Sequence, residues 1–460
     1  MFSSITHQYP DTGTFTIRIR GTFPRPLFGE DNSLFGSTRD KDKIVAIQQW
    51  GNQPWSTLID AFFDCDSLEY GAVDSPNLTN ATHLSGMFES TGKFNGNLDN
   101  WDVSSIIDFE RMFKDATSFN QPLNNWDVSS AENMVAMFDG ASQFNQPLSN
   151  WDVSSLVTSS RMFANAALFN QPIGNWLTDS VRFMNEMFRN ATSFNNPLNS
   201  WDVSSVIDMS GMFWSDSGNM VFNQPLNNWN VSSVTNMNFM CRGSRFNQPL
   251  NSWDVSSVQN FGGMFMNDSI FNQPLNNWDV SSSNYMHFMF YNAKQFNQPV
   301  NNWDVSSVTS MFYMFSRASQ FNQPLSNWNT STLITTARLF EGASTFNQNL
   351  GNWDISNMQN SNFMLIYSGM SVENYDSTLI SWQVRSHLNN VYLGVDSLRY
   401  CASDSARNLL IANGWVFSGD TLNCLGVGID EEVQQEHASF KIYPNPTSGK
   451  IFIETMAGNI

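Results

Sequence analysis

Eight aspartates recur at one fixed place in the sequence, directly after a tryptophan, and they are the residues best suited to chemistry. They are Asp102, Asp127, Asp152, Asp202, Asp254, Asp279, Asp304 and Asp354. Carboxylate oxygens are hard ligands that suit calcium, so one prediction is a row of calcium sites. The alternative is that each carboxylate accepts hydrogen bonds from the backbone N–H groups of the serines that follow it. Asn230 and Asn329 replace the acid in two units and Leu177 replaces it in a third, which favours the structural alternative.

The rest of the chain offers little support for catalysis. The five histidines are scattered over different segments: His7, His83, His287, His387 and His437. None belongs to a Cys/His metal-binding spacing or to an H-E-x-x-H motif. There is no G-x-S-x-G elbow, no Walker loop and no G-x-G-x-x-G motif after a strand. We therefore expect a protein that is not an enzyme, with no metal centre and no cofactor except in the calcium alternative.

A repeat of about 25 residues must position these aspartates. The phrase FNQPLNNWDV stands at residues 119–128 and 271–280, with one-letter variants at 144–153 and 296–305. The repeat tryptophans are Trp101, Trp126, Trp151, Trp176, Trp201, Trp229, Trp253, Trp278, Trp303, Trp328 and Trp353. The spacing lengthens at residues 214–229, where we predict a surface insertion. Such a period is typical of solenoids, whose units bury their apolar faces against one another.

Each unit predicts a short strand followed by a short helical turn. In residues 123–128 apolar and polar side chains alternate, which places Trp126 toward the core and Asp127 toward solvent. Three apolar residues of 134–138 then follow at i, i+3 and i+4, the spacing of a helical face. About thirteen such units in residues 46–370 predict an α/β solenoid on the leucine-rich-repeat plan, with one parallel sheet and helical turns on the opposite wall.

An asparagine follows the repeat phenylalanine in every unit, and we interpret this column as a structural ladder. Each amide is expected to satisfy backbone groups in a buried turn and to contact the amides of adjacent units. The ladder includes Asn120, Asn145, Asn170, Asn195, Asn272 and Asn297.

The exposed face of the predicted sheet is the candidate ligand-binding surface, because it is polar, acidic and long. Such surfaces bind extended partners through many weak contacts. The candidate ligand-binding residues are Asn125, Asp127, Asp152, Asp254, Asp279 and Asp304. Trp214 is a further candidate, since it stands outside the repeat phase, whereas the repeat tryptophans are assigned to the core.

The repeat resembles a known family. The pattern FNQPL-x-x-WDVSSV-x-x-M-x-x-MF is similar to the repeat of BspA-like and mycoplasma-lipoprotein-like bacterial surface proteins. The resemblance covers residues 46–370 and implies a leucine-rich-repeat-like surface protein used for attachment.

Two flanking segments resemble modules of secreted bacterial proteins. Residues 7–19 are similar to the closing strands of a PKD-like domain, so we expect residues 1–45 to be the end of that domain and a linker. Residues 440–454 carry the pattern YPNP-T-x-G-x-I-x-I and resemble the opening of the C-terminal sorting domain of the type IX secretion system of Bacteroidetes. This resemblance implies that residues 425–460 are a linker and a truncated sorting domain, that the secretion machinery is a partner, and that the chain is a fragment.

Residues 371–424 depart from the repeat and are expected to form a small helical cap at the end of the solenoid, which such a fold needs. Residues 373–382 and 406–415 predict amphipathic helices. Cys401 and Cys424 flank the second helix and are expected to form a disulfide in a secreted protein. Two unrelated thiols are the alternative.

Composition narrows the range of partners. The formal charge is −19, and the chain has no basic cluster, which argues against nucleic acid and anionic membranes. No run of about 18 apolar residues predicts a transmembrane helix. We expect a secreted or outer-membrane-attached surface protein that binds an extracellular protein or glycan without catalysis. The alternatives are a structural spacer of a larger surface protein and the binding module of a multidomain carbohydrate-active enzyme.

Overall fold

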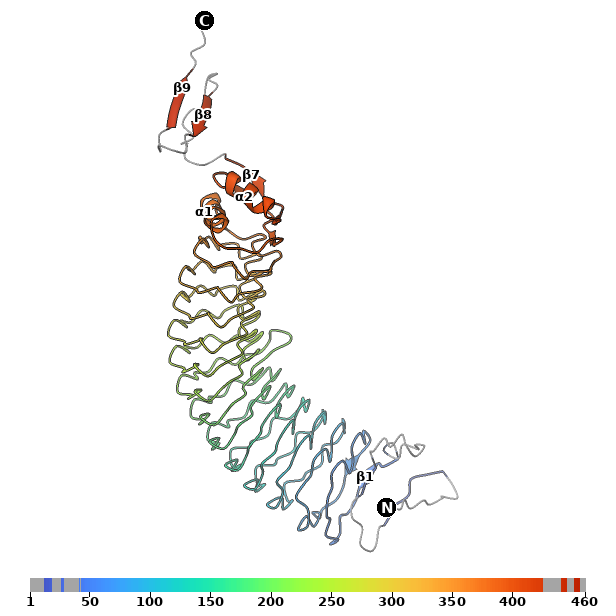
Figure 1. Ribbon diagram of the computed structural model, residues 1–460. Coiled ribbons are helices and arrows are strands. Elements are labelled where there is room, and N and C mark those ends of the chain that lie inside the picture. Colours follow the sequence, from blue (N-terminus) through green and yellow to red (C-terminus); the bar gives the residue numbers. More distant parts are fainter. Residues whose placement is uncertain are drawn as a thin grey trace. The chain divides into compact units, whose positions relative to one another are not determined.

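The computed structural model (Figure 1) describes residues 12–18, 26–28, 41, 43–424, 440–444 and 451–455. The chain divides into two units, Met1–Leu422 and Asn423–Ile460. In the second unit, β8 (Phe440–Pro444) pairs antiparallel with β9 (Ile451–Thr455). In the segment that resembles the closing strands of a PKD-like domain, residues 12–18 are described and form no strand, and the rest lies outside the described residues, as does most of residues 425–460.

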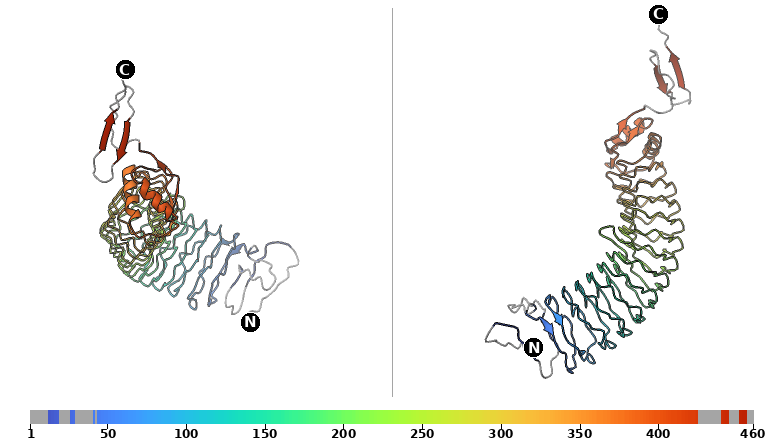
Figure 2. Two further views of the ribbon diagram at one scale, coloured as in Figure 1. Left: turned by 45° about the horizontal axis from the view of Figure 1, so that its top comes forward. Right: turned by 180° about the vertical axis from the view of Figure 1, so that it is seen from behind.

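The repeat units of the first unit form coils that lie side by side (Figures 1 and 2). Each coil pairs with the next through a parallel bridge seven residues after the repeat tryptophan, as in Asp108 with Asn133 and Asn133 with Thr158. These bridges continue from coil to coil between His83 and Asn360. Before them, β1 (Ala46–Ile47) pairs in parallel with β2 (Glu69–Tyr70). The repeats therefore build a solenoid.

The predicted helical turn of each coil is wrong, because the backbone pairs between coils instead. The N–H groups of Phe109, Arg111 and Phe113 donate to carbonyl oxygens of the next coil at 2.8, 2.8 and 2.9 Å. An α-helix would direct those N–H groups four residues back along its own segment. Left-handed backbone at Arg111 (φ 55°) and Asp115 (φ 58°) turns the chain within each coil. In the described residues between 43 and 370 there is no α-helix.

The predicted strand at 123–128 is also wrong, although its inward and outward assignments are right. Asn124 and Asn125 form a turn, and the parallel pairing lies instead on the wall that was assigned to helices. Trp126 is buried, with 2% of its surface exposed, and Asp127 is exposed. A tight turn can therefore give the same alternation of side chains as a strand.

Stacked aromatic rings fill the core. Phe113 packs on Phe119 of its own coil at 4.0 Å between ring centroids and on Phe138 of the next coil at 5.6 Å. The repeat tryptophans are buried beside them, and Trp126 Nε1 donates to the backbone oxygen of Leu98 at 2.9 Å. The same bond recurs from Trp151 to Trp353, so each buried indole N–H has an acceptor in the preceding coil.

The two predicted helices are present beyond the last repeat, as α1 (Val372–Gln383) and α2 (Asp404–Ala412) (Figure 2). The side chain of Ser371 caps α1 by accepting the Asn374 N–H. α2 ends three residues earlier than predicted, because Gly414 takes a left-handed backbone (φ 85°) and leads into β6 (Val416–Ser418).

Short parallel strands accompany these helices. The order β3 (Asn360–Ser361), β4 (Tyr392–Gly394) and β6 extends the pairing of the coils, and β5 (Arg399–Tyr400) pairs with β7 (Thr421–Leu422). Cys401 and Cys424 are both disulfide-bonded. Among the described residues, no helix has the length and apolar character needed to cross a membrane.

Candidate functional site

The aspartates after the repeat tryptophans lie at the surface, and each holds a turn together. Asp127 Oδ1 accepts the Ser129 N–H at 3.1 Å and the Ser129 hydroxyl at 2.6 Å. The equivalent backbone bond is found at Asp102, Asp152, Asp202, Asp254, Asp279, Asp304 and Asp354. Asn230 makes both bonds to Ser232 at 3.2 and 2.8 Å without a negative charge. The turn therefore does not require an anion, and the coil with Leu177 at this position forms the same turn without a side-chain acceptor.

Hydrogen bonds also favour the charged form of several carboxylates in this column. The side chain of Ser154, followed by its backbone N–H, lowers the pKa of Asp152, and the corresponding serines lower the pKa of Asp254 and Asp304. Within the described residues, no three His, Cys, Asp or Glu side chains gather closely enough to hold a metal ion. Asn125 donates to Asp99 at 2.7 Å, a bond between adjacent coils.

The asparagine column links neighbouring coils. Asn120 Oδ1 accepts the backbone N–H of Asn145 at 2.9 Å and the side-chain amide of Gln146 at 3.0 Å. The same backbone bond recurs at Asn145, Asn170, Asn195, Asn272 and Asn297. The predicted contact with amides of adjacent coils is present, through a glutamine at most positions and through Asn196 at Asn170. The predicted burial is wrong, because these asparagines are half-exposed or exposed.

Trp214 is packed against neighbouring coils and is only half-exposed. The guanidinium carbons of Arg189 and Arg242 lie 4.2 and 4.6 Å from the centroid of its ring. The exposed part of the insertion is residues 216–219. The sequence shows only that Trp214 stands outside the repeat spacing. It does not indicate that Arg189 and Arg242, from the coils on either side, cover its ring.

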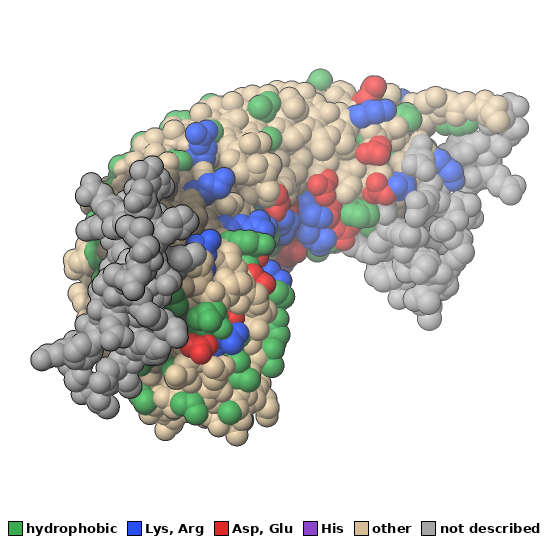
Figure 3. Space-filling model, turned by 90° about the horizontal axis from the view of Figure 1, so that it is seen from above, with side chains coloured by type: hydrophobic (Ala, Val, Ile, Leu, Met, Phe, Trp, Pro, Cys, Tyr) green, Lys and Arg blue, Asp and Glu red, His purple; other side chains and the backbone are tan. Residues whose placement is uncertain are grey.

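A second surface, which we call the variable face, was missed by the sequence analysis. It consists of the segments around the apolar pair of each coil: 108–115, 133–140, 158–165, 183–190, 208–216, 236–243, 260–267, 285–292, 310–317, 335–342 and 360–367. Their alternate N–H groups bond the next coil, so the backbone repeats, whereas the outward side chains differ. Figure 3 shows acidic and basic side chains gathered in one band across neighbouring coils.

One column of the variable face shows how freely its residues change. The residue before the apolar pair has a left-handed backbone, with φ between 53° and 61°, in every coil. It is Arg111, Ala136, Arg161, Glu186, Gly211, Phe239, Gly263, Phe288, Tyr313, Arg338 and Phe363. The residues of this column vary from coil to coil, while the apolar pair beside them hardly changes. This contrast could have indicated the variable face from the sequence alone.

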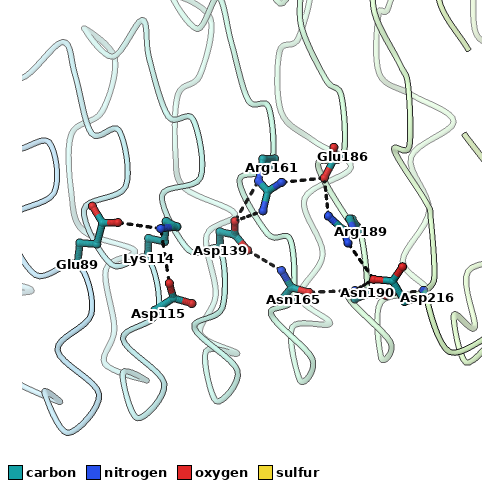
Figure 4. Close-up of polar contacts among 10 residues, drawn as sticks. All are labelled: Glu89, Lys114, Asp115, Asp139, Arg161, Asn165, Glu186, Arg189, Asn190 and Asp216. Carbon is teal, nitrogen blue, oxygen red and sulfur yellow. Dashed lines mark hydrogen bonds and ion pairs between the residues drawn. The ribbon is translucent and has the colours of Figure 1, made fainter. Parts of the chain in front are cut away.

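The part of the variable face before residue 217 is a ladder of ion pairs between coils (Figure 4). Lys114 Nζ lies 2.8 Å from Glu89. The guanidinium nitrogens of Arg161 lie 2.7 Å from a carboxylate oxygen of Asp139 and 2.9 Å from one of Glu186. The ladder continues through Arg189, which lies 3.1 Å from Glu186 and 2.9 Å from Asp216. Each of these cations already has a carboxylate partner, and two of the carboxylates, Glu89 and Asp139, are buried.

Further along, the variable face becomes aromatic. We define the aromatic patch as Tyr285, His287, Phe288, Tyr291, Phe312 and Tyr313. Phe288 lies 4.9 Å from Tyr313, 5.4 Å from Phe312 and 5.8 Å from Tyr291, measured between ring centroids. Tyr285 is 52% exposed, and the other five rings are half-buried. Tyrosine and phenylalanine are enriched at protein interfaces relative to the rest of the surface.

Comparison with known proteins gives one family. Five overlapping stretches match the model of the family described as Mycoplasma protein of unknown function, DUF285: residues 56–167, 132–220, 150–245, 201–298 and 278–382. Together they span residues 56–382, well over half of the chain. No curated protein matches the chain.

Proposed function

We propose that this chain, which belongs to the family described as Mycoplasma protein of unknown function, DUF285, is a non-catalytic binding scaffold whose variable face contacts an extracellular protein or glycan. Adhesion through this face is the role that we assign to the solenoid. The family description names no function, so the proposal rests on the surface chemistry of this chain.

The observation that carries the proposal is the difference between the two surfaces of the coil. The surface that carries Asp127 repeats the same side chains in coil after coil, and those side chains bond one another. The variable face has an equally regular backbone, yet its side chains range from an ion-pair ladder to exposed aromatic rings. Stacking of the coils does not require the side chains of the variable face to differ. Recognition of a specific partner does require it.

The binding experiment presents the full chain to an array of extracellular-matrix proteins and glycans, with calcium and with chelator. We expect saturable binding to at least one protein or glycan, weakened by salt because the chain is strongly charged. Replacing Tyr285 with Ser should weaken that binding, while replacing Asn125 with Ser should not. Loss of binding with chelator would instead support calcium sites along the aspartate column.

A structural spacer is the second candidate function, and the continuous coil-to-coil bonding of the asparagine and tryptophan columns favours it. Binding to no member of the array would support the spacer. The third alternative is the binding module of a carbohydrate-active enzyme. Sequencing the gene upstream of residue 1 tests it, because a catalytic motif there is expected for that enzyme and not for an adhesin or a spacer.

The surface location is part of the proposal. It rests on the resemblance of the repeat to bacterial surface proteins and of residues 440–454 to a type IX sorting domain, with residues 7–19 resembling a PKD-like domain. Labelling of intact cells by an antibody against residues 46–370 would support this location. Labelling only after the cells are lysed would count against it.

We also propose that about thirteen coils occupy residues 46–370 and that residues 371–424 close the stack. Two bonds support the closure: Trp382 Nε1 donates to Leu350 O at 3.0 Å, and the Asn374 amide donates to Asn347 O at 2.9 Å, as their counterparts do in the repeats. Deleting residues 371–424 should expose the last coil and cause association at low micromolar concentration. A monomeric, fully folded deletion variant would contradict the closure.

A further inference from the structure

Large aromatic residues occupy a backbone position of the variable face that suits glycine. Phe239, Phe288 and Tyr313 have φ of 55°, 58° and 58°. Gly211 and Gly263 fill the same position in other coils. A left-handed backbone is sterically unfavourable for a bulky side chain and unrestricted for glycine. The fold sets this backbone throughout the column, and the bulky rings of Phe239, Phe288 and Tyr313 add steric cost there while remaining half-exposed. Rings in such a place point to a role other than folding.

The geometry of the rings favours polypeptide over sugar as the occupant of the aromatic patch. Phe288 and Tyr313 stack on each other at an interplanar angle of 14°, and Phe312 meets Tyr313 edge-on at 87° with 4.3 Å between centroids. A pyranose ring stacks on an open aromatic face, whereas here neighbouring rings cover one another. Their exposed edges form an uneven apolar surface of the kind that side chains pack against.

The cations around the aromatic patch differ from those of the ion-pair ladder. Segments 236–243, 260–267, 285–292 and 310–317 contain no Asp or Glu. Among the described residues, neither Arg242 nor Arg317 has an ion pair. The guanidinium carbon of Arg242 lies 4.6 Å from the ring centroid of Trp214, and its Nε is buried without a hydrogen-bond partner. The guanidinium carbon of Arg317 lies 5.8 Å from the ring centroid of Tyr291. A chain of net charge −19 thus presents on this face two guanidinium groups that make no ion pair, although Asp216, which pairs with Arg189, is close enough to Arg242 to act on its charge.

We propose that the aromatic patch, with Arg242 and Arg317, binds an acidic polypeptide segment that carries apolar side chains. This inference rests on the proposed function and names its ligand class. Apolar side chains of the segment pack on the ring edges, and its carboxylates pair with the two guanidinium groups, which are planar donors suited to carboxylates.

The spacing of the coils limits the length of this segment. Three coil-to-coil steps separate the coil of Arg242 from that of Arg317, which is roughly 14 Å at about 4.8 Å per step. An extended polypeptide covers that distance in about four residues. The two carboxylates are therefore expected about four residues apart, with the apolar side chains between them.

The test uses the full chain and three soluble polymers. The probe is a fluorescent random copolymer of glutamate and tyrosine, and the comparisons are polyglutamate, which lacks rings, and hyaluronan, an acidic glycan. We expect the copolymer to bind at least tenfold more tightly than either comparison, with affinity that falls as salt is raised. Equal or tighter binding of hyaluronan would overturn the proposal in favour of a glycan.

Substitutions with matched controls locate the binding. Phe288→Gly introduces the residue that the backbone prefers, so the coil should fold, and we expect at least a fivefold loss of copolymer affinity. Arg317→Gln should cause a similar loss. The controls are Ala136→Gly, in the same left-handed column, and Arg161→Gln, a cation of the ion-pair ladder, and both should change affinity less than twofold. Circular dichroism of each variant verifies folding, and a folded Phe288→Gly variant with unchanged affinity would overturn the proposal.

The outcome separates this inference from the broader function. If the array yields a ligand that depends on Tyr285 while the copolymer fails to bind, the acidic-peptide assignment is wrong and the binding function stands. If neither the array nor the copolymer yields binding, both are wrong.

Discussion

The buried carboxyl group of Asp268 should make the stability of the chain depend on pH. Asp268 stands where most coils have alanine, such as Ala116 and Ala293, and it is fully buried. Its carboxylate oxygens accept hydrogen bonds from the Ser244 hydroxyl at 2.9 Å and the Phe246 N–H at 3.1 Å. Burial nevertheless dominates and raises the pKa of Asp268 to about 8.

The sign of the effect follows from proton linkage. Because the pKa of Asp268 is higher in the folded chain than in the unfolded one, the folded state binds more protons between about pH 4 and 8. Stability should therefore fall as pH rises through this window, by at most about 1.4 kcal/mol per pH unit. Urea unfolding at pH 6.0 and 8.5 should show the loss in the native chain and not in Asp268→Ala.

Asp152→Asn is the control for Asp268, because the pKa of Asp152 is lowered and that group does not titrate between pH 6.0 and 8.5. Its pH dependence in this range should match that of the native chain. A native chain with equal stability at both pH values would contradict the raised pKa of Asp268.

The repeat tryptophan offers the strongest single-residue test of the core. Trp126 is 2% exposed, and its indole N–H bonds Leu98. Trp126→Ala should reduce the free energy of unfolding by about 3–5 kcal/mol, because it leaves a cavity and an unpaired carbonyl. Thermal unfolding followed by tryptophan fluorescence measures the effect, with Asn125→Ser as an exposed control. An unchanged midpoint in Trp126→Ala would contradict its place in the core.

At the scale of secondary-structure elements, the sequence predicted the helices of the C-terminal region and failed inside the repeat. α1 has its own serine cap and an amphipathic face, so local sequence determines it. In the repeat, Met134, Met137 and Phe138 have helical spacing, but the backbone is decided by bonds to the next coil. Glycine fills left-handed positions in some coils, such as Gly140 and Gly263. Because glycine favours such a backbone and weakens a helix, these residues argue against a helix in this segment.

The left-handed column gives a test at this scale. Ala136 has φ of 53°, so Ala136→Gly removes steric strain and should raise the free energy of unfolding by about 0.5 kcal/mol or more, even after the entropy cost of glycine. Ala141→Gly is the matched control, because Ala141 is buried outside the left-handed positions and its loss should destabilise the coil. Urea midpoints compare the two, and destabilisation by both would contradict the assigned backbone.

At the scale of the whole molecule, the period of the sequence was enough to predict a solenoid but not the variable face. Repetition made the columns of Asp127 and Asn120 conspicuous, and the structure shows both bonded within the fold. The variable face was overlooked because its residues share no pattern along the chain. Its members come together only when coils stack, so that Phe288 meets Phe312 and Tyr313 from the next coil.

Hydrogen–deuterium exchange of the full chain with and without the array ligand tests the variable face most directly. If that face binds, peptides covering residues 285–292 and 310–317 should gain protection on ligand addition, while those covering residues 123–130 should not. Protection confined to residues 123–130 and their counterparts would place the ligand on the aspartate surface instead and contradict the account.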